Sequence, residues 1–299
     1  MLRSVRASAL LALLTLQPAF SLAIIPHAKL TQATLAAFDN YVRGRETLIE
    51  RQIAEGPFLW VGQKPERMRQ LQRAGMVVEP LAGSGAENIG NGVVHDWLGT
   101  VFVPGATLER ALAVLQNYDA HKVSFAPEVT DSKLRRRDGD FFQVYLRLRK
   151  HRVITVVLNT EYDITYRRVS PARVASRSYS TRIAEVANPG TASERELTPG
   201  DDHGFLWRLH SFWRFEERDG GVYVEFEAVS LTRDVPRIVS AIVTPVVRQL
   251  PRESLEMTLL NLRRALRQPA SPNRPPQAGP AGGCPMGSAS WLCFLLNRK

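Results

Sequence analysis

The chain has 299 residues, of which 44% are hydrophobic and 23% are charged. These are the proportions of a globular protein, and they exclude a chain that is disordered throughout. Beyond position 25 no apolar run reaches the length of a membrane-spanning helix, which excludes a helical channel or transporter. The formal charge is +10, but residues 24–268 carry 34 basic and 29 acidic side chains. So mild an excess does not predict a nucleic-acid partner.

The first 23 residues have the order of features found in a secretory signal peptide. Arg3 and Arg6 come first, an apolar stretch over 9–16 follows, and Ser21 and Ala23 stand at positions −3 and −1 of a cleavage site. We therefore expect residues 1–23 to be removed and the mature chain to be secreted or periplasmic. An uncleaved N-terminal anchor is the alternative.

Residues 24–88 are predicted to form an N-terminal helix and a connector. Between residues 29 and 55 hydrophobic side chains recur at helical spacing and make one stripe, formed by Leu35, Phe38, Val42, Ile49 and Ile53. Such a helix either docks on its own domain or binds a partner or a membrane surface. Prolines and glycines between residues 56 and 90 break regular structure and mark the connector.

From Val93 the pattern becomes that of β-strands. Val93–Val103 is rich in strand-forming residues, and Thr107 is placed to cap a short helix after it. Apolar and polar side chains alternate over 142–148 and 154–166, and a further strand is expected over 173–186. This alternation predicts antiparallel strands with one buried face.

The next pair of strands forms a hairpin whose register follows from its charges. A two-residue turn at Asp219 and Gly220 pairs Arg214 with Glu225, whereas a shift by one residue would set Glu216 opposite Glu225. Like charges in opposite positions are unfavourable, so we predict the first register, with a type I′ turn. It places seven apolar residues on one face: Phe205, Trp207, Leu209, Trp213, Phe215, Val224 and Phe226.

A long amphipathic helix is predicted near the end of the chain. Pro245 and Pro251 divide this segment into a short apolar piece and a helix over 251–267, with a stripe made by Leu255, Leu259, Leu262 and Leu266. A twisted antiparallel sheet wrapped around this C-terminal helix would bury the apolar faces of both. The expected fold class is therefore α+β, with a helix-grip architecture.

The last 31 residues have a different composition from the rest of the chain. Residues 269–299 contain six prolines and four glycines, which predicts a disordered tail. Both cysteines of the chain, Cys284 and Cys293, lie in this tail. We therefore expect a fold that is not held together by disulfides, even in an oxidising compartment.

Three segments resemble the START-like (SRPBCC) superfamily, which includes polyketide cyclase-like and lipid-transfer proteins: HDWLGTVFVPGATLERALAVLQNYDAHK, GFLWRLHSFWRFEERDGGVYVEFEAVSLTRDVP and PRESLEMTLLNLRRAL. The sequence is similar to a secreted bacterial branch of this superfamily. The resemblance covers residues 89–268, the predicted START-like domain, and rests on the order of elements rather than on a catalytic motif. It implies a cavity between the sheet and the C-terminal helix that holds a lipid, a sterol-like compound or a polyketide.

The apolar residues of the predicted sheet and helix supply candidates for the lining of such a cavity. They are Trp97, Leu146, Val156, Trp207, Trp213, Phe226, Leu255 and Leu259. Ligand sites for apolar molecules are lined in this way, but the same side chains would also fill a closed core.

Catalytic and metal-binding patterns are sparse. The six histidines form no HExxH, HxH or Cys/His motif, so we predict neither a metal site nor a cofactor. Tyr118, Asp119 and His121 could supply acid/base chemistry if they faced the cavity, or they could form local hydrogen bonds. Asp201, Asp202 and His203 are placed in an exposed loop, beside a proline and a glycine. No catalytic residue is predicted.

Two arginines leave a further alternative open. Arg147 or Arg208 could pair with a ligand carboxylate, or with Glu225 or Glu227 of the hairpin.

Two functions fit this sequence. The first is a secreted or periplasmic carrier that binds a hydrophobic small molecule or lipid and makes transient contact with a membrane surface. The alternative is a cyclase or aromatase-type enzyme that uses the same cavity and needs an acid/base pair within it. A purely structural domain with a filled core is a third reading.

Overall fold

The computed structural model describes residues 26–151, 154–234 and 240–268, with side chains at all of these except 240–248. The predicted signal peptide and the predicted tail lie outside the described residues. Within the described part, no helix is both long enough and apolar enough to cross a bilayer.

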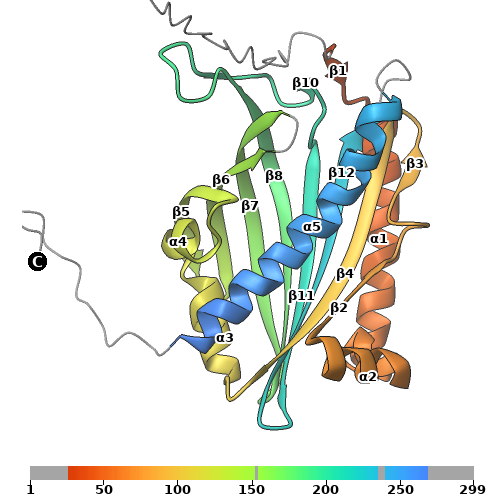
Figure 1. Cartoon of the computed structure of the whole chain (residues 1–299), viewed down its shortest axis with the longest axis vertical. Helices are drawn as coiled ribbons and strands as arrows, with labels where there is room; N and C mark the ends of the chain where they lie inside the picture. Colours follow the sequence, from red (N-terminus) through yellow and green to blue (C-terminus); the bar gives the residue numbers. More distant parts are fainter. Residues whose placement is uncertain (1–25, 152–153, 235–239, 269–299) are drawn as a thin grey trace, which may run out of the picture. The chain divides into compact units, whose positions relative to one another are not determined.

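Antiparallel strands build one large sheet, in the order β2-β4-β12-β11-β8-β7-β6-β5, with β3 added beside β4 and β9 beside β8 (Figure 1). Two further short strands, β1 and β10, pair with each other. The bounds are β1 Ala28–Lys29, β2 Met76–Pro80, β3 Glu87–Ile89, β4 Gly92–Pro104, β5 Val129–Asp138, β6 Phe141–His151, β7 Thr155–Ser170, β8 Arg173–Ala187, β9 Arg195–Glu196, β10 Asp201–Asp202, β11 Arg208–Arg218 and β12 Gly221–Arg233.

Helices lie on both faces of this sheet. Their bounds are α1 Gln32–Glu55, η2 Trp60–Gln63, α2 Pro65–Ala74, α3 Leu108–Gln116, η3 Tyr118–Ala120, α4 His121–Ser124 and α5 Ser240–Arg267. We call the face that packs against α5 the front face and the face that packs against α1 the back face. Figure 1 shows α5 crossing the front face diagonally, which is the predicted helix-grip arrangement.

The N-terminal helix docks on its own domain. The side chain of Thr31 caps it by accepting a hydrogen bond from the backbone N–H of Thr34 at 3.1 Å. Phe38 and Val42 then pack with Phe212 of β11 in a hydrophobic cluster on the back face. Docking on the domain, one of the two predicted alternatives, is therefore confirmed.

This docking buries the central strands on both faces. Nearly every residue of β4 and β12 is buried, including the charged side chains of Asp96, Glu225 and Glu227. The one buried face predicted for residues 142–148 and 154–166 therefore does not describe β4 and β12, because α1 and η2 cover their second face.

The connector contains more regular structure than its composition suggested. Pro65 occupies the first turn of α2, where its missing N–H costs nothing, and Gly75 ends the helix in the left-handed region with φ 73°. β2 then pairs with β4, from Met76 opposite Val101 onward. The sheet therefore begins before residue 89, and Pro65, one of the expected breakers, begins a helix.

The predicted hairpin register is confirmed. Arg214 pairs with Glu225 across β11 and β12. Asp219 and Gly220 both have positive φ, 56° and 71°, as a type I′ turn requires. The charge argument therefore selected the correct alignment of the strands.

The leucine stripe of α5 is buried as predicted, but the helix is not divided. It runs without a break from Ser240 through Pro245 and Pro251. Proline inside a helix removes a backbone donor and crowds the carbonyl four residues earlier, which is why a division was expected. Leu255 and Leu259 pack at Gly99 of β4, where a Cβ would come within 2.6 Å of either leucine. Glycine at this position lets the helix lie close to the strand.

Candidate functional site

Six of the eight predicted lining residues lie on the front face. Trp97, Phe226, Leu255 and Leu259 belong to its buried cluster, whereas Leu146 and Trp213 pack against that cluster while partly exposed. Two aromatic rings of the hairpin stack on each other. The ring centroids of Trp213 and Phe226 lie 4.0 Å apart, and the two ring planes are nearly parallel.

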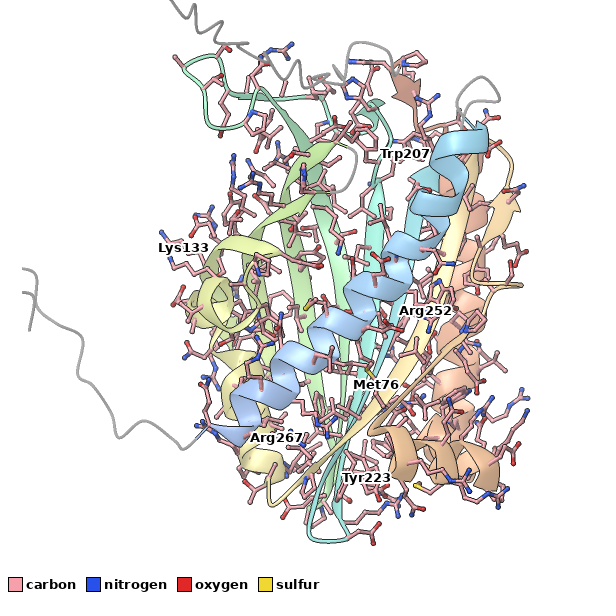
Figure 2. The ribbon with its side chains drawn as sticks, in the orientation of Figure 1. Met76, Lys133, Trp207, Tyr223, Arg252 and Arg267 are labelled. Atoms are coloured by element: carbon pink, nitrogen blue, oxygen red, sulfur yellow. The ribbon has the colours of Figure 1, made fainter. Side chains whose placement is uncertain are left out.

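The placement of the other two residues differs from the prediction. Trp207 belongs to the back-face cluster with Phe38, and its indole N–H donates to Asp202 at 3.0 Å. Trp207 precedes β11, so the alternation that holds within the strand does not extend to it; Figure 2 shows it at the opposite end of the sheet from Tyr223. Val156 is partly buried near the start of β7 and lies outside the described hydrophobic clusters.

The front face has a tightly packed centre and partly buried apolar side chains around it. Leu255 and Leu259 close α5 onto β4 at Gly99, and both are fully buried. Met76 and Val78 of β2 are partly buried, and so are five residues of β6, β11 and β12. We call these five residues the front patch: Leu146, Leu148, Leu209, Trp213 and Ala228.

Hydroxyl groups lie beside the front patch. Strand pairing places Ser178 of β8 opposite Ser211, between Leu209 and Trp213. Ser180 accepts a hydrogen bond from the backbone N–H of Leu209 at 3.0 Å. The lining therefore combines apolar surface with a few polar groups, as small-molecule sites do.

The ionisable groups considered for acid/base chemistry form hydrogen bonds with other parts of the protein, of which that of His121 is local. The Tyr118 and Tyr166 hydroxyls lie 2.9 Å apart, and burial raises the pKa of Tyr166 to about 12. A ring nitrogen of His121 lies 2.8 Å from the Leu115 carbonyl oxygen, and burial lowers the pKa of His121 to about 4, so it is neutral at pH 7. Asp119 accepts from the backbone of Leu134. The local alternative is confirmed for His121, whereas Tyr118 and Asp119 bond to the distant strands β7 and β5.

An acid/histidine pair that sequence reasoning missed lies at one end of the front face. A bulge shifts the pairing of β7 and β8 by one residue, so that Ile183 lies opposite Thr160 and Glu185 lies opposite Leu158. Beyond the bulge, odd-numbered residues of β8 therefore lie on the front face. His203 Nδ1 lies 2.5 Å from Glu185 Oε1. Burial raises the pKa of Glu185, and the neighbouring His203 opposes that rise. Neither the bulge nor the pairing leaves a signal in the sequence.

The back face of the same strands is held closed by ion pairs. Arg45 of α1 contacts Glu227 at 2.9 Å and Asp96 at 3.3 Å, and the Tyr41 hydroxyl donates to Asp96 at 2.8 Å. Burial raises the pKa of Asp96 to about 8, with a further increase from Glu227 that Arg45 opposes.

A second buried ion pair lies on the same face. Arg214 pairs with Glu225, whose carboxylate also accepts a hydrogen bond from the backbone N–H of Trp60 in η2 at 3.2 Å.

The partners expected for Arg147 and Arg208 are wrong. Arg147 pairs with Glu194, and Arg208 donates to the carbonyl of Trp207. Glu225 is paired with Arg214, as the hairpin register predicts, and Glu227 is paired with the distant Arg45 of α1.

Comparison with known proteins yields similarity of fold. No protein-family model matches the chain, and no curated protein matches it. Solved structures that resemble it include a STAR-related lipid transfer protein from Xanthomonas axonopodis, with 18% identity, TM-score 0.43 and coverage of 65% of this chain and 99% of that one. The Zhui aromatase/cyclase from Streptomyces sp. R1128 matches with 14% identity, TM-score 0.38 and coverage of 58% and 91%. Human STARD10 matches with 10% identity, TM-score 0.37 and coverage of 67% and 80%.

The helix-grip fold expected from the sequence is present. It is confirmed by the sheet order and by α5 packing across the front face. The similarities concern the course of the chain and assign neither a ligand nor an activity to this protein.

Proposed function

We propose that this protein binds an apolar or amphipathic small molecule, such as a lipid, a sterol-like compound or a polyketide, and carries it outside the cytoplasm. The ligand would lie on the front patch, beside α5. The observation that supports this most strongly is the partly exposed front patch, whose apolar side chains lie beside the hydroxyls of Ser178 and Ser180. The back face of the same strands is covered by α1 and carries the buried charges of Arg45 and Arg214.

The chemistry of the lining favours a carrier over a catalyst. An apolar surface next to Ser178 and Ser180 would hold a ligand by burial and hydrogen-bond its few oxygen atoms. The Tyr118 hydroxyl bonds to Tyr166 and His121 bonds to the Leu115 carbonyl, so neither is poised for proton transfer.

Titration with a fluorescent fatty acid tests the location of the ligand. Ala228 is small and partly exposed within the front patch, so Ala228→Phe should occupy the space of the ligand and weaken binding by tenfold or more. Ala36→Phe, on the exposed side of α1, adds the same bulk away from the front face and should bind like the wild type. Equal affinity in both variants, or no saturable binding by the wild type, would refute the proposal.

The pair of Glu185 and His203 favours a second candidate, a cyclase or aromatase-type enzyme. A buried carboxylate that orients an imidazole is an arrangement used for general acid/base catalysis. The test is incubation with a synthetic poly-β-keto thioester, followed by mass spectrometry for a product that has lost water. An enzyme should form this product, and Glu185→Gln should abolish turnover while leaving binding intact. A carrier should bind the thioester unchanged.

Membrane contact is proposed as the step at which the carrier exchanges its ligand. Met257 and Leu260 lie exposed on α5, and Arg264 and Arg267 follow in its last turn. Apolar side chains flanked by cations suit the surface of an anionic bilayer. Cosedimentation with vesicles containing phosphatidylglycerol should fall for Leu260→Gln. Unchanged cosedimentation of that variant would place the contact elsewhere.

A further inference from the structure

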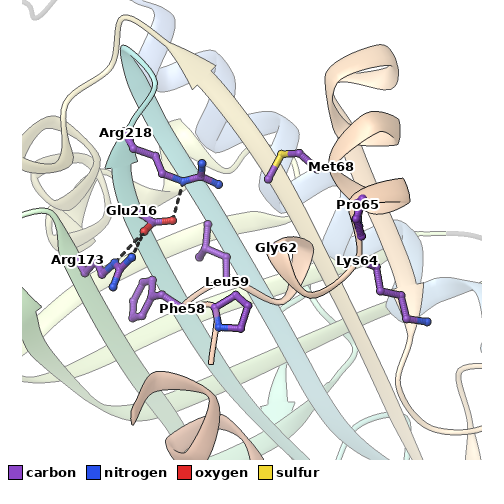
Figure 3. Close-up of a pocket in the computed structure, with 10 residues that line it drawn as sticks. Phe58, Leu59, Gly62, Lys64, Pro65, Met68, Arg173, Glu216 and Arg218 are labelled. Atoms are coloured by element: carbon purple, nitrogen blue, oxygen red, sulfur yellow. Dashed lines mark hydrogen bonds and ion pairs between the residues drawn. The ribbon is translucent and has the colours of Figure 1, made fainter. Parts of the chain in front are cut away.

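A pocket of about 420 Å³ lies on the back-face side, between the η2 to α2 connection and the strands β8 and β11 (Figure 3). Its volume is in the range of small-molecule sites. The residues that line it are Pro57, Phe58, Leu59, Gly62, Lys64, Pro65, Met68, Arg173, Glu216 and Arg218. It is separate from the front patch, because Glu216 and Arg173 share the face of the sheet that carries Arg214.

A buried carboxylate holds two arginines at one wall of this pocket. Arg173 Nε donates to Glu216 at 2.7 Å, and Arg218 Nε donates to the other oxygen of the same carboxylate at 2.8 Å. Figure 3 shows the two guanidinium groups reaching Glu216 from different sides. Arg218 also donates to Asp219 at 2.9 Å. A guanidinium has five N–H donors, so both arginines keep donors for a ligand.

The other walls of the pocket are formed by apolar side chains and by Lys64. Phe58 and Leu59 are buried, and Met68 is partly buried beside them. Lys64 lies exposed at the start of α2 and forms no ion pair with any residue that the structure describes. No side chain caps this end of α2, and Glu66 in its first turn balances the positive end of the helix dipole.

We infer that this pocket is a second binding site, which takes an amphipathic monoanion with a carboxylate head and a short apolar body. Three cations line the pocket, Lys64, Arg173 and Arg218, together with one carboxylate, Glu216, and Arg218 also pairs with Asp219 outside the lining. One positive charge therefore remains, which matches a carboxylate better than a doubly charged phosphate. Arginine also suits the planar geometry of a carboxylate, and the apolar walls would cover several methylene groups.

Methyl NMR with methionine labelling tests this site without ambiguity about location. Met68 lines the pocket, whereas Met76 packs against the front cluster, so the two methyl groups report on different sites. Titration with octanoate should shift the Met68 signal in a saturable way. Octanol and octyl phosphate, which have the same chain length, should each bind at least fivefold more weakly. A shift of Met76 with no shift of Met68, or equal binding of octanol, would overturn the inference.

A matched pair of lysine variants separates the site from general charge effects. Lys64→Gln removes the unpaired cation at the pocket, and Lys133→Gln removes an exposed lysine on β5, the last strand in the sheet order (Figure 2). We expect octanoate binding at Met68 to weaken on the order of fivefold for Lys64→Gln, as for loss of an exposed ion pair. Lys133→Gln should bind like the wild type. Equal effects of both variants would also overturn the inference.

The double variant Arg173→Gln/Glu216→Gln removes one cation together with its buried partner, so no lone charge is left. It should retain the wild-type NMR spectrum away from the pocket and lose most octanoate affinity. A folded double variant that binds octanoate normally would contradict the role of the arginine pair.

Discussion

Leu259→Ala should be among the most destabilising single changes in this protein. Leu259 is fully buried and packs against Gly99 of β4. The substitution removes three carbon groups at about 0.8 kcal/mol each, or about 2.4 kcal/mol of transfer free energy. Gly99 has no side chain that could move into the vacated space, so a cavity remains and adds to this cost. We expect the free energy of unfolding to fall by about 3 to 5 kcal/mol.

Denaturant unfolding followed by circular dichroism measures this change. The adjacent Leu260 is 39% exposed and provides the control, because Leu260→Ala removes the same atoms from the outer side of α5. Its effect should stay within about 0.5 kcal/mol of the wild type. A loss below about 1 kcal/mol for Leu259→Ala, or equal losses for both variants, would refute the packing of α5 at Gly99.

Three further predictions concern the electrostatics and the ends of the chain. The raised pKa of Asp96, about 8, means that the folded protein holds a proton that the unfolded chain releases near its ordinary pKa of about 4. The free energy of unfolding should therefore fall as the pH rises from about 4 to about 8. Urea unfolding measured across this pH range should show the decrease in the wild type but not in Asp96→Asn. The same pH dependence in both proteins would contradict the assignment to Asp96. Deletion of residues 269–299 should leave the melting temperature nearly unchanged, and a loss as large as that of Leu259→Ala would place the domain boundary wrongly. N-terminal sequencing of exported protein should begin at Ile24, whereas intact Met1 in the cytosol would contradict export.

The parts of the fold that local patterns determine could be predicted from the sequence. The hairpin register followed from the cost of placing Glu216 opposite Glu225, and the structure has that register. The buried stripe of α5 followed from the spacing of its leucines. In both cases the information lies within about twenty consecutive residues.

The parts that depend on distant packing could not be predicted. In the alternating pattern of their strands, Asp96 and Glu227 occupy positions that would be expected to face solvent. Both are instead covered by Arg45 of the N-terminal helix. Trp207 continues the odd-numbered pattern of β11 but precedes the strand, and it packs on the opposite face. Glu185 faces forward because of a bulge. No local periodicity records any of these contacts.

The candidate site was predicted in outline and corrected in detail. The aromatic stack of Trp213 and Phe226 is on the front face as expected. Leu255 and Leu259, in contrast, pack tightly at Gly99, and the partly exposed front patch lies on β6, β11 and β12. A leucine stripe looks the same in sequence whether it closes a core or lines a ligand site.

Native mass spectrometry of the gently purified mature chain tests the central proposal most directly. A carrier should show a population with excess mass, and solvent extraction should release an apolar or amphipathic molecule that accounts for it. The Ala228→Phe variant should lack this population, while Ala36→Phe should retain it. A wild-type protein that carries no extra mass, and takes up none after incubation with lipids, sterols and polyketides, would contradict the account.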